Sequence, residues 1–206
     1  TDSDFYSVVG AAGELFSLRC NLYEEIPDFV ILDDFIISMK VAQKGYRIIY
    51  EPGAYASELP SFSIKDEKKR KIRIAAGGYQ ALLMLKSLFR FWENPRLFFL
   101  YFSHRVLRWT LSPLCLVLAF FSNLILFLEG SSRLFDSLFY LQLIFYALAL
   151  IGSFVKSNSG IVKISRVFYY FVFMNLSVIL GFFRFLKGKQ AATWEKAKRM
   201  QQTTSL

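Results

Sequence analysis

Three long stretches without a charged side chain constrain this chain more than any other feature of its sequence. They cover residues 109–128, 137–155 and 167–183. An α-helix rises about 1.5 Å per residue, so about 20 apolar residues cross a hydrocarbon core about 30 Å thick. Three such segments in a soluble protein would need a large polar shell. The sequence therefore predicts an integral membrane protein with about three transmembrane helices, at 110–128, 137–155 and 167–185, within a membrane region of residues 110–186.

The composition narrows the protein class further. The 206 residues are 54% hydrophobic and 18% aromatic, which is far too apolar for a disordered chain. Two cysteines exclude a disulfide scaffold. The first residue is Thr, and no signal-peptide pattern follows it. We expect a C-terminal fragment of a longer protein, whose soluble part at residues 1–78 is the later half of an α/β domain.

The charges between the apolar segments predict their orientation. The loop from Glu129 to Asp136 contains one Arg and two acids, whereas the loop from Lys156 to Arg166 contains three basic residues and no acid. By the positive-inside rule, the second loop and the residues before the first helix are cytoplasmic. A basic tail at residues 187–206 would then lie outside if all three segments span, which the same rule disfavours. The side of the tail is left open.

Residues 79–109, in front of the first apolar stretch, mix aromatic and basic side chains. Leucines and aromatic residues alternate with Lys86, Arg90 and Arg96, and the segment ends at Trp109. This pattern is typical of an amphipathic helix in the headgroup layer. Nucleic acid is not an expected partner, because no recognition motif accompanies the basic residues and anionic lipid attracts such a patch.

An acidic pair opens the clearest local pattern of the soluble part. Asp33 and Asp34 precede apolar positions that suit a helix with one buried face, and Gly45 follows as its terminator. Residues 46–50 then predict a short strand, and Pro52 with Gly53 a turn. Two interpretations of the pair stay open. The helix dipole favours acids at this position, so they can be a simple cap, or they include a general base for an acceptor hydroxyl.

Two arginines and several glycines complete the candidate residues. The i, i+3 spacing of Arg70 and Arg73 puts both on one helix face, where they could clamp a diphosphate. The alternative is a charge run that faces solvent or lipid headgroups. Gly77 and Gly78 predict close packing or a bend. Gly13 belongs to a turn where backbone can approach a ligand closely.

Taken in order, these pieces resemble the membrane-bound inverting glycosyltransferases of family 2, which include the cellulose, hyaluronan and poly-N-acetylglucosamine synthases. The resemblance covers almost the whole chain and implies an architecture. That architecture is the C-terminal part of a GT-A-like (Rossmann-like) α/β glycosyltransferase domain, then an interfacial helix and transmembrane helices. The segments that carry the resemblance are Gly13-x5-Arg19, Asp33-Asp34, residues 45–52, Glu58, Arg70-x2-Arg73, residues 103–109, and Gly188-Lys189-Gln190 with Trp194, Lys196 and Arg199.

The resemblance implies roles for individual residues. Asp34 matches the general base, and Asp33 stands where the family more often has Glu. Gly13 and Arg19 match the segment that shapes the acceptor site. Arg70 and Arg73 match the first and fourth positions of the QxxRW motif, and Trp109 and Trp194 are the supporting aromatic residues.

The motif also departs from the family pattern. The QxxRW motif contacts the donor diphosphate and the acceptor end, and here Arg70 replaces its Gln and Ile74 its Trp. The arginine that would meet phosphate is retained, whereas the aromatic platform for an acceptor sugar is lost. This difference favours transfer of one or a few sugars over processive polymer synthesis.

Substrates, cofactor and location follow from the same resemblance. The donor would be a nucleotide-sugar, expected to be a UDP-sugar, and the acceptor a glycan or lipid at a bacterial inner or plasma membrane, with the catalytic part cytoplasmic. A divalent metal, Mg²⁺ or Mn²⁺, would be bound mainly by a missing N-terminal half, so this fragment alone would hold no metal and be inactive. The alternative is a non-catalytic membrane anchor whose basic face binds anionic lipid or a partner protein.

Overall fold

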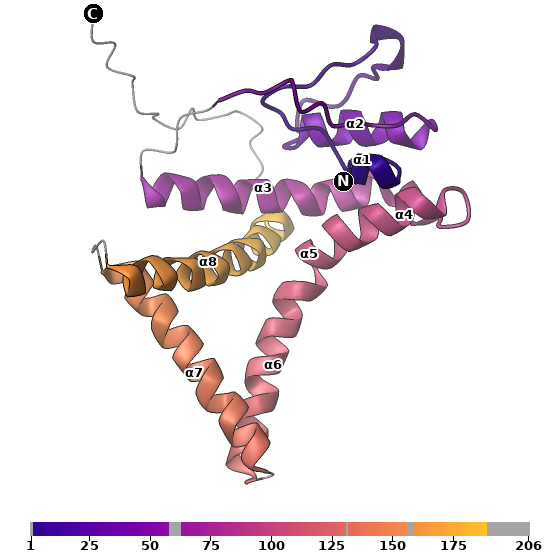
Figure 1. Ribbon diagram of the computed structural model, residues 1–206. Helices are drawn as coiled ribbons and strands as arrows, with labels where there is room; N and C mark the ends of the chain where they lie inside the picture. Colours follow the sequence, from indigo (N-terminus) through magenta and orange to yellow (C-terminus); the bar gives the residue numbers. More distant parts are fainter. Residues whose placement is uncertain (1, 58–62, 131, 156–158, 189–206) are drawn as a thin grey trace, which may run out of the picture. The chain divides into compact units, whose positions relative to one another are not determined.

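A computed structural model describes residues 2–57, 63–130, 132–155 and 159–188, and the elements that it assigns there are all helical (Figure 1). The longer helices carry the architecture, and short 3-10 and π-helical pieces join them. The elements are α1 (Asp2–Phe5), η1 (Cys20–Leu22), α2 (Asp33–Gln43), α3 (Ile64–Met84), η2 (Lys86–Phe89), α4 (Pro95–Tyr101), η3 (Phe102–Val106), α5 (Leu107–Trp109), α6 (Leu111–Leu128), α7 (Arg133–Phe154) and α8 (Gly160–Leu186).

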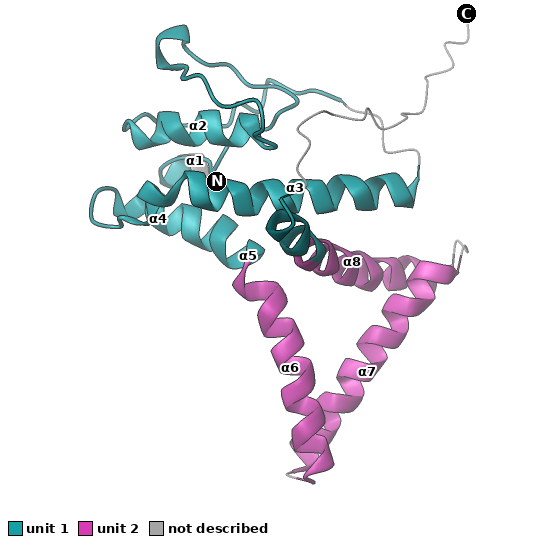
Figure 2. Cartoon of the chain, turned by 180° about the vertical axis from the view of Figure 1, so that it is seen from behind, with its two compact units in different colours: residues 1–109, 180–206 teal, residues 110–179 magenta. Residues whose placement is uncertain are grey.

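The chain divides into two compact units (Figure 2). Unit 1 consists of Thr1–Trp109 and Leu180–Leu206, and unit 2 of Thr110–Ile179. Unit 1 therefore contains the predicted soluble part, and unit 2 contains most of the apolar helices.

The predicted helix after the acidic pair is confirmed as α2. It begins at Asp33, and its apolar residues Phe35, Ile36 and Met39 are buried. Gly45 follows the helix with a φ of +87°, a left-handed conformation that glycine adopts without a steric penalty. The spacing of the apolar residues and the terminator Gly45 together predicted where this helix begins and ends.

The strand predicted at residues 46–50 is not observed, and no strand occurs among the residues that the structure describes. Ile48 accepts a hydrogen bond from the Val8 N–H at 2.9 Å and donates its own N–H to the Ser7 hydroxyl at 2.9 Å. A strand needs a ladder of such bonds, and here the pairing stops after one point of contact. The α/β, GT-A-like part of the predicted fold is therefore not shown.

The prediction of one amphipathic helix over residues 79–109 is also wrong in its local structure. After α3 ends, the chain forms η2, α4, η3 and α5 in succession. A new helix begins at Pro95 because the Asn94 side chain accepts a hydrogen bond from the Leu97 N–H at 3.1 Å. Four leucines of this segment, Leu85, Leu88, Leu97 and Leu100, join the core of unit 1, whereas Leu83 is exposed. The core residues are Val9, Val30, Phe35, Ile36, Met39, Ala42, Ala81, Leu85, Leu88, Leu97, Leu100, Tyr101, Val106 and Trp109.

The glycine pair of α3 allows close packing and does not end the helix. A Cβ on Gly77 would come within 2.8 Å of side-chain atoms of Ile31, and one on Gly78 would come within 2.8 Å of the Trp109 ring. Such distances are far below normal contact, so only glycine lets the segment before α2 and the end of α5 approach α3 this closely. The close-packing interpretation is confirmed.

Three helices are long and apolar enough to span a membrane: Leu111–Leu128, Arg133–Phe154 and Gly160–Leu186. Within unit 2, α6 and α7 are joined by a hydrogen bond from Asn123 to Gln142 at 3.1 Å and by stacked rings of Phe127 and Phe139, 4.7 Å apart. A Cβ on Gly152 of α7 would overlap the Ser165 carbonyl of α8, so these helices pack closely as well.

The third apolar helix is longer than the 167–185 predicted from the sequence. It begins at Gly160 and includes Lys163 and Arg166. The prediction began later because it used the absence of charged residues, whereas a helix readily includes long basic side chains near its end. Its 27 residues exceed the length needed to cross a hydrocarbon core.

Gln80 gives a direct test of the packing in unit 1. Its side-chain oxygen accepts a hydrogen bond from the Ile31 N–H at 3.0 Å, and its amide group donates to the Phe29 carbonyl at 3.2 Å. Gln80→Leu would leave both backbone groups without these partners. We expect the free energy of unfolding to fall by about 1–3 kcal/mol, measured by denaturant unfolding in detergent. Gln43→Leu is the control, because the bond between Gln43 and Ser87 is exposed, and an equal loss in both variants would contradict the prediction.

Candidate functional site

The two carboxylates of the acidic pair lie in the first turn of α2 in different surroundings. Leu32 occupies the N-cap position and makes no side-chain cap. Asp33 is exposed, whereas Asp34 is half-buried. The helix dipole favours both negative charges at this position, but only Asp34 is partly withdrawn from water. The pair therefore offers one solvated carboxylate and one shielded carboxylate.

Gly13 lies directly against Asp34. A Cβ at Gly13 would be 2.8 Å from Asp34 Oδ2, and the Leu15 N–H donates to the Ala12 carbonyl at 3.3 Å, which closes a turn around Gly13. The turn thus lies against the carboxylate of Asp34, and the predicted close approach of its backbone to a ligand stays a prediction. A Cβ on Gly10, whose φ is +88°, would come even closer to the Phe35 ring.

Burial raises the pKa of the Asp34 carboxyl above its ordinary value. The negative charges of Asp33 and Glu14 act in the same direction, while a hydrogen bond from the Phe35 backbone and the positive charge of Arg105 oppose it. A carboxylate with a raised pKa is a stronger base once it is ionised. The ionised Asp34 carboxylate is therefore a stronger base than a fully solvated aspartate.

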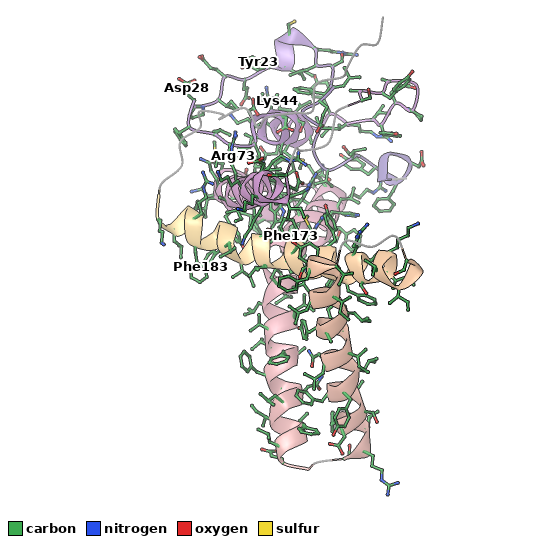
Figure 3. The ribbon with its side chains drawn as sticks, turned by 90° about the vertical axis from the view of Figure 1, so that its left-hand side faces the viewer. Tyr23, Asp28, Lys44, Arg73, Phe173 and Phe183 are labelled. Atoms are coloured by element: carbon green, nitrogen blue, oxygen red, sulfur yellow. The ribbon has the colours of Figure 1, made fainter. Side chains whose placement is uncertain are left out.

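Arg73 lies on α3 (Figure 3), and the charge of Asp33 at the start of α2 acts on its guanidinium. Burial lowers the pKa of its half-buried guanidinium, the charge of Arg184 adds to this effect, and the charge of Asp33 opposes it. Arginine keeps its proton through such shifts. The structure thus brings a positive group from α3 within electrostatic reach of the acidic pair.

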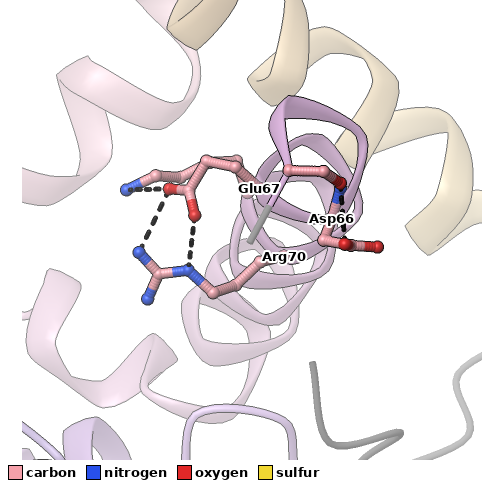
Figure 4. Close-up of polar contacts among 5 residues, drawn as sticks. Asp66, Glu67 and Arg70 are labelled. Carbon is pink, nitrogen blue, oxygen red and sulfur yellow. Dashed lines mark hydrogen bonds and ion pairs between the residues drawn. The ribbon is translucent and has the colours of Figure 1, made fainter. Parts of the chain in front are cut away.

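Arg70 has a different arrangement, although it lies only one turn away. Its Nε and Nη2 donate to the two carboxylate oxygens of Glu67 at 3.1 Å each, and Lys71 Nζ lies 3.5 Å from the same carboxylate (Figure 4). These are local pairs at i, i+3 and i, i+4 spacing on a helix surface. The role of Arg70 at a diphosphate stays a prediction.

Arg105 joins the site although sequence reasoning gave it no role. Its Nη2 donates to the Val9 carbonyl at 2.7 Å, and its guanidinium lies over the Phe35 ring, 4.9 Å from the centroid. The Trp109 ring is 5.7 Å away on the same group. Trp109, predicted as a supporting residue, is buried with Phe35 in the core. Arg105 lies in the segment 103–109 that carries part of the family resemblance, but its basic and aromatic neighbours indicated a lipid contact and not a place beside Asp34.

The remaining candidates lie elsewhere or outside the description. Arg19 is exposed just before η1, and no hydrogen bond or ion pair joins it to the acidic pair in the described part of the chain. Trp194 and Glu58 fall outside the described residues. Within the described ranges, no group of three or more His, Cys, Asp or Glu side chains could hold a metal ion. The expected divalent metal, bound mainly by residues outside this chain, stays a prediction.

A family model described as "Glycosyl transferase family group 2" matches residues 2–183. The chain belongs to this family. The predicted membership of glycosyltransferase family 2 is therefore confirmed, and with it a transferase that moves a glycosyl group. Searches of curated proteins and of solved structures found no match.

Gly13 provides a test of the site geometry. Gly13→Ala would place a methyl group against Asp34 Oδ2 and displace the carboxylate or the turn that covers it. We expect glycosyl transfer by the full-length protein in membranes to fall by roughly 10- to 100-fold, since misplacement of a catalytic group by about 1 Å has this effect. Gly53→Ala is the control, because its new methyl group meets only the mobile end of Glu51. Full activity of Gly13→Ala would show that this contact has no role.

Proposed function

We propose that this glycosyltransferase catalyses an inverting displacement in which Asp34 is the general base. The observation that carries the proposal is the half-buried Asp34 carboxylate, which lies against Gly13 at the start of α2 and has a raised pKa. A base must be shielded enough to attract a proton and open enough to meet a hydroxyl group. Asp33, exposed beside it, is better suited to influence the local charge than to take the proton.

The reaction is a single substitution at the anomeric carbon of a nucleotide-sugar, for which we propose a UDP-sugar. Asp34 takes the proton of an acceptor hydroxyl as its oxygen forms a bond to the anomeric carbon. The bond between that carbon and the diphosphate oxygen breaks, and the electron pair leaves with the nucleoside diphosphate. One displacement inverts the configuration at the anomeric carbon. The acceptor is a glycan or lipid at the membrane.

Arg73 is the residue that we propose for the departing diphosphate. Negative charge develops on the leaving oxygen, and a fixed guanidinium stabilises that charge without reorganising at the moment of reaction. Its reach to Asp33 supports a place on the same side as the base. Arg70, which pairs with Glu67, enters the proposal only through its matching motif position.

The wider context is part of the same proposal. The three apolar helices support an integral membrane protein. We propose that residues 1–78 are the later part of a cytoplasmic catalytic domain, that Gly13 and Arg19 shape the acceptor site, and that the relatives include polysaccharide synthases. A divalent metal would be held by residues beyond those described. The membrane-anchor alternative is set aside, because the family match implies a transferase.

Asp34→Asn tests the base directly. The amide cannot accept the proton, so we expect release of nucleoside diphosphate by the full-length protein in membranes to fall by about 100-fold or more. Donor binding should stay nearly unchanged, because the substitution keeps the size of the side chain. Asp33→Asn is the matched control and should retain substantial transfer. Full turnover by Asp34→Asn would reduce the acidic pair to a helix cap.

Arg73→Ala tests the contact with the leaving group. Removal of the guanidinium should weaken binding of the nucleoside diphosphate by about 10-fold, measured by titration of the membrane-embedded protein. Lys68→Ala is the control, since Lys68 is exposed on the same helix. Equal affinity of wild type and Arg73→Ala would assign this residue to another role.

A further inference from the structure

We propose that Arg105 is a positioning residue, which holds the loop at residues 9–13 over Asp34 and fixes a positive charge at this loop. This inference rests on the proposed function, because it assigns Arg105 to the control of the same base. Family membership does not identify this residue, and the sequence pattern around it is that of a lipid-facing segment.

The guanidinium of Arg105 is fixed by three contacts. One is the 2.7 Å hydrogen bond from Nη2 to the Val9 carbonyl. The other two are the faces of Phe35 and Trp109, whose rings are themselves buried, with exposed fractions of 4% and 6%. A guanidinium held against aromatic rings keeps its charge and its donor geometry. Arg105 is therefore a charge held in one place.

The backbone beneath Arg105 is unusual in itself. Arg105 belongs to η3, a π-helical stretch of five residues between α4 and α5. The sequence of η3 contains neither Gly nor Pro, so no local conformational preference demands this winding. Isolated π-helical turns occur frequently at functional sites, because they change the direction in which a side chain leaves the helix.

The loop that Arg105 contacts is held at three successive points. Val9 is bonded to Arg105, the Ala11 N–H donates to the Ser38 hydroxyl at 2.9 Å, and Gly13 lies against Asp34. Ser38 and Asp34 are one turn apart on α2. Arg105 thus anchors the start of the loop, and α2 anchors the remainder.

Charges on α2, on the loop before η1 and on η3 act on Asp34. Asp33 on α2 and Glu14 in the loop raise the pKa of its carboxyl, whereas Arg105 lowers it. Arg105 is itself faced by Arg108, by Asp34 and by the Tyr101 hydroxyl. Because Arg105 is the positive side chain that offsets two acids, its removal should raise the pKa of Asp34 further.

The test is the pH profile of glycosyl transfer by the full-length protein in membranes. Transfer requires ionised Asp34, so kcat/KM falls as pH drops through the pKa of this group. In Arg105→Met, which keeps a long apolar side chain without charge, this acid limb should move up by roughly one pH unit, and the plateau above it should fall because the bond to Val9 is lost. Arg105→Lys keeps the charge and should leave the limb close to its wild-type position.

Ser38→Ala separates charge from loop anchoring, because it releases Ala11 without changing any charge. It should lower transfer at all pH values and leave the acid limb in place. If Arg105→Met fails to fold, Arg105→Gln provides the neutral variant, with a donor that can still reach Val9. An unmoved limb in the neutral variant, or equal shifts in the Lys and neutral variants, would overturn the role of Arg105. Loss of the proposed function itself would appear separately, as full transfer by Asp34→Asn.

Discussion

A carboxylate half withdrawn from water at the start of α2 is the constraint around which unit 1 is arranged. Burial of charge is unfavourable unless nearby groups compensate for it. The helix dipole, the Phe35 N–H and the fixed charge of Arg105 provide that compensation for Asp34. Gly13 completes the arrangement, since only a residue without a side chain can lie so close to the carboxylate.

The same arrangement explains why distant parts of the sequence meet here. Four segments contribute to the site. The loop before η1 contributes backbone and the first turn of α2 contributes the carboxylate. The middle of α3 contributes the guanidinium of Arg73, and the π-helical segment contributes the fixed charge of Arg105. The aromatic contacts of Phe35 with Tyr101 and Trp109 hold α2 against α4 and α5. Chemistry and core packing therefore depend on the same side chains, and Phe35 belongs to both.

The sequence predicted the elements that depend on local patterns. The periodicity of α2, its terminator Gly45 and the first apolar helix needed only neighbouring residues, and the structure has them. Features that depend on partners far away in the chain were missed. The strand at 46–50 lacks a ladder in the described residues, and the segment 79–109 is broken because its leucines are needed in a core that sequence spacing does not reveal. Arg70 lies between these two cases. Its ion-pair partner Glu67 stands three residues earlier, so this pair could have been predicted from the spacing in the sequence. Of the candidate site, the acidic pair and Gly13 were within reach of the sequence, whereas Arg105 required the fold.

The π-helical winding of η3 also bears on how the length of this segment can vary. An α-helix turns by about 100° per residue, so the insertion or loss of one residue rotates everything beyond it around the axis. In η3 such a change would turn Arg105 away from Val9, or displace Trp109 from its place beneath Gly78. Conservative replacement of a neighbouring side chain leaves that register intact. Between Pro95 and Trp109, the count of residues is therefore a stricter requirement than the identity of most of them.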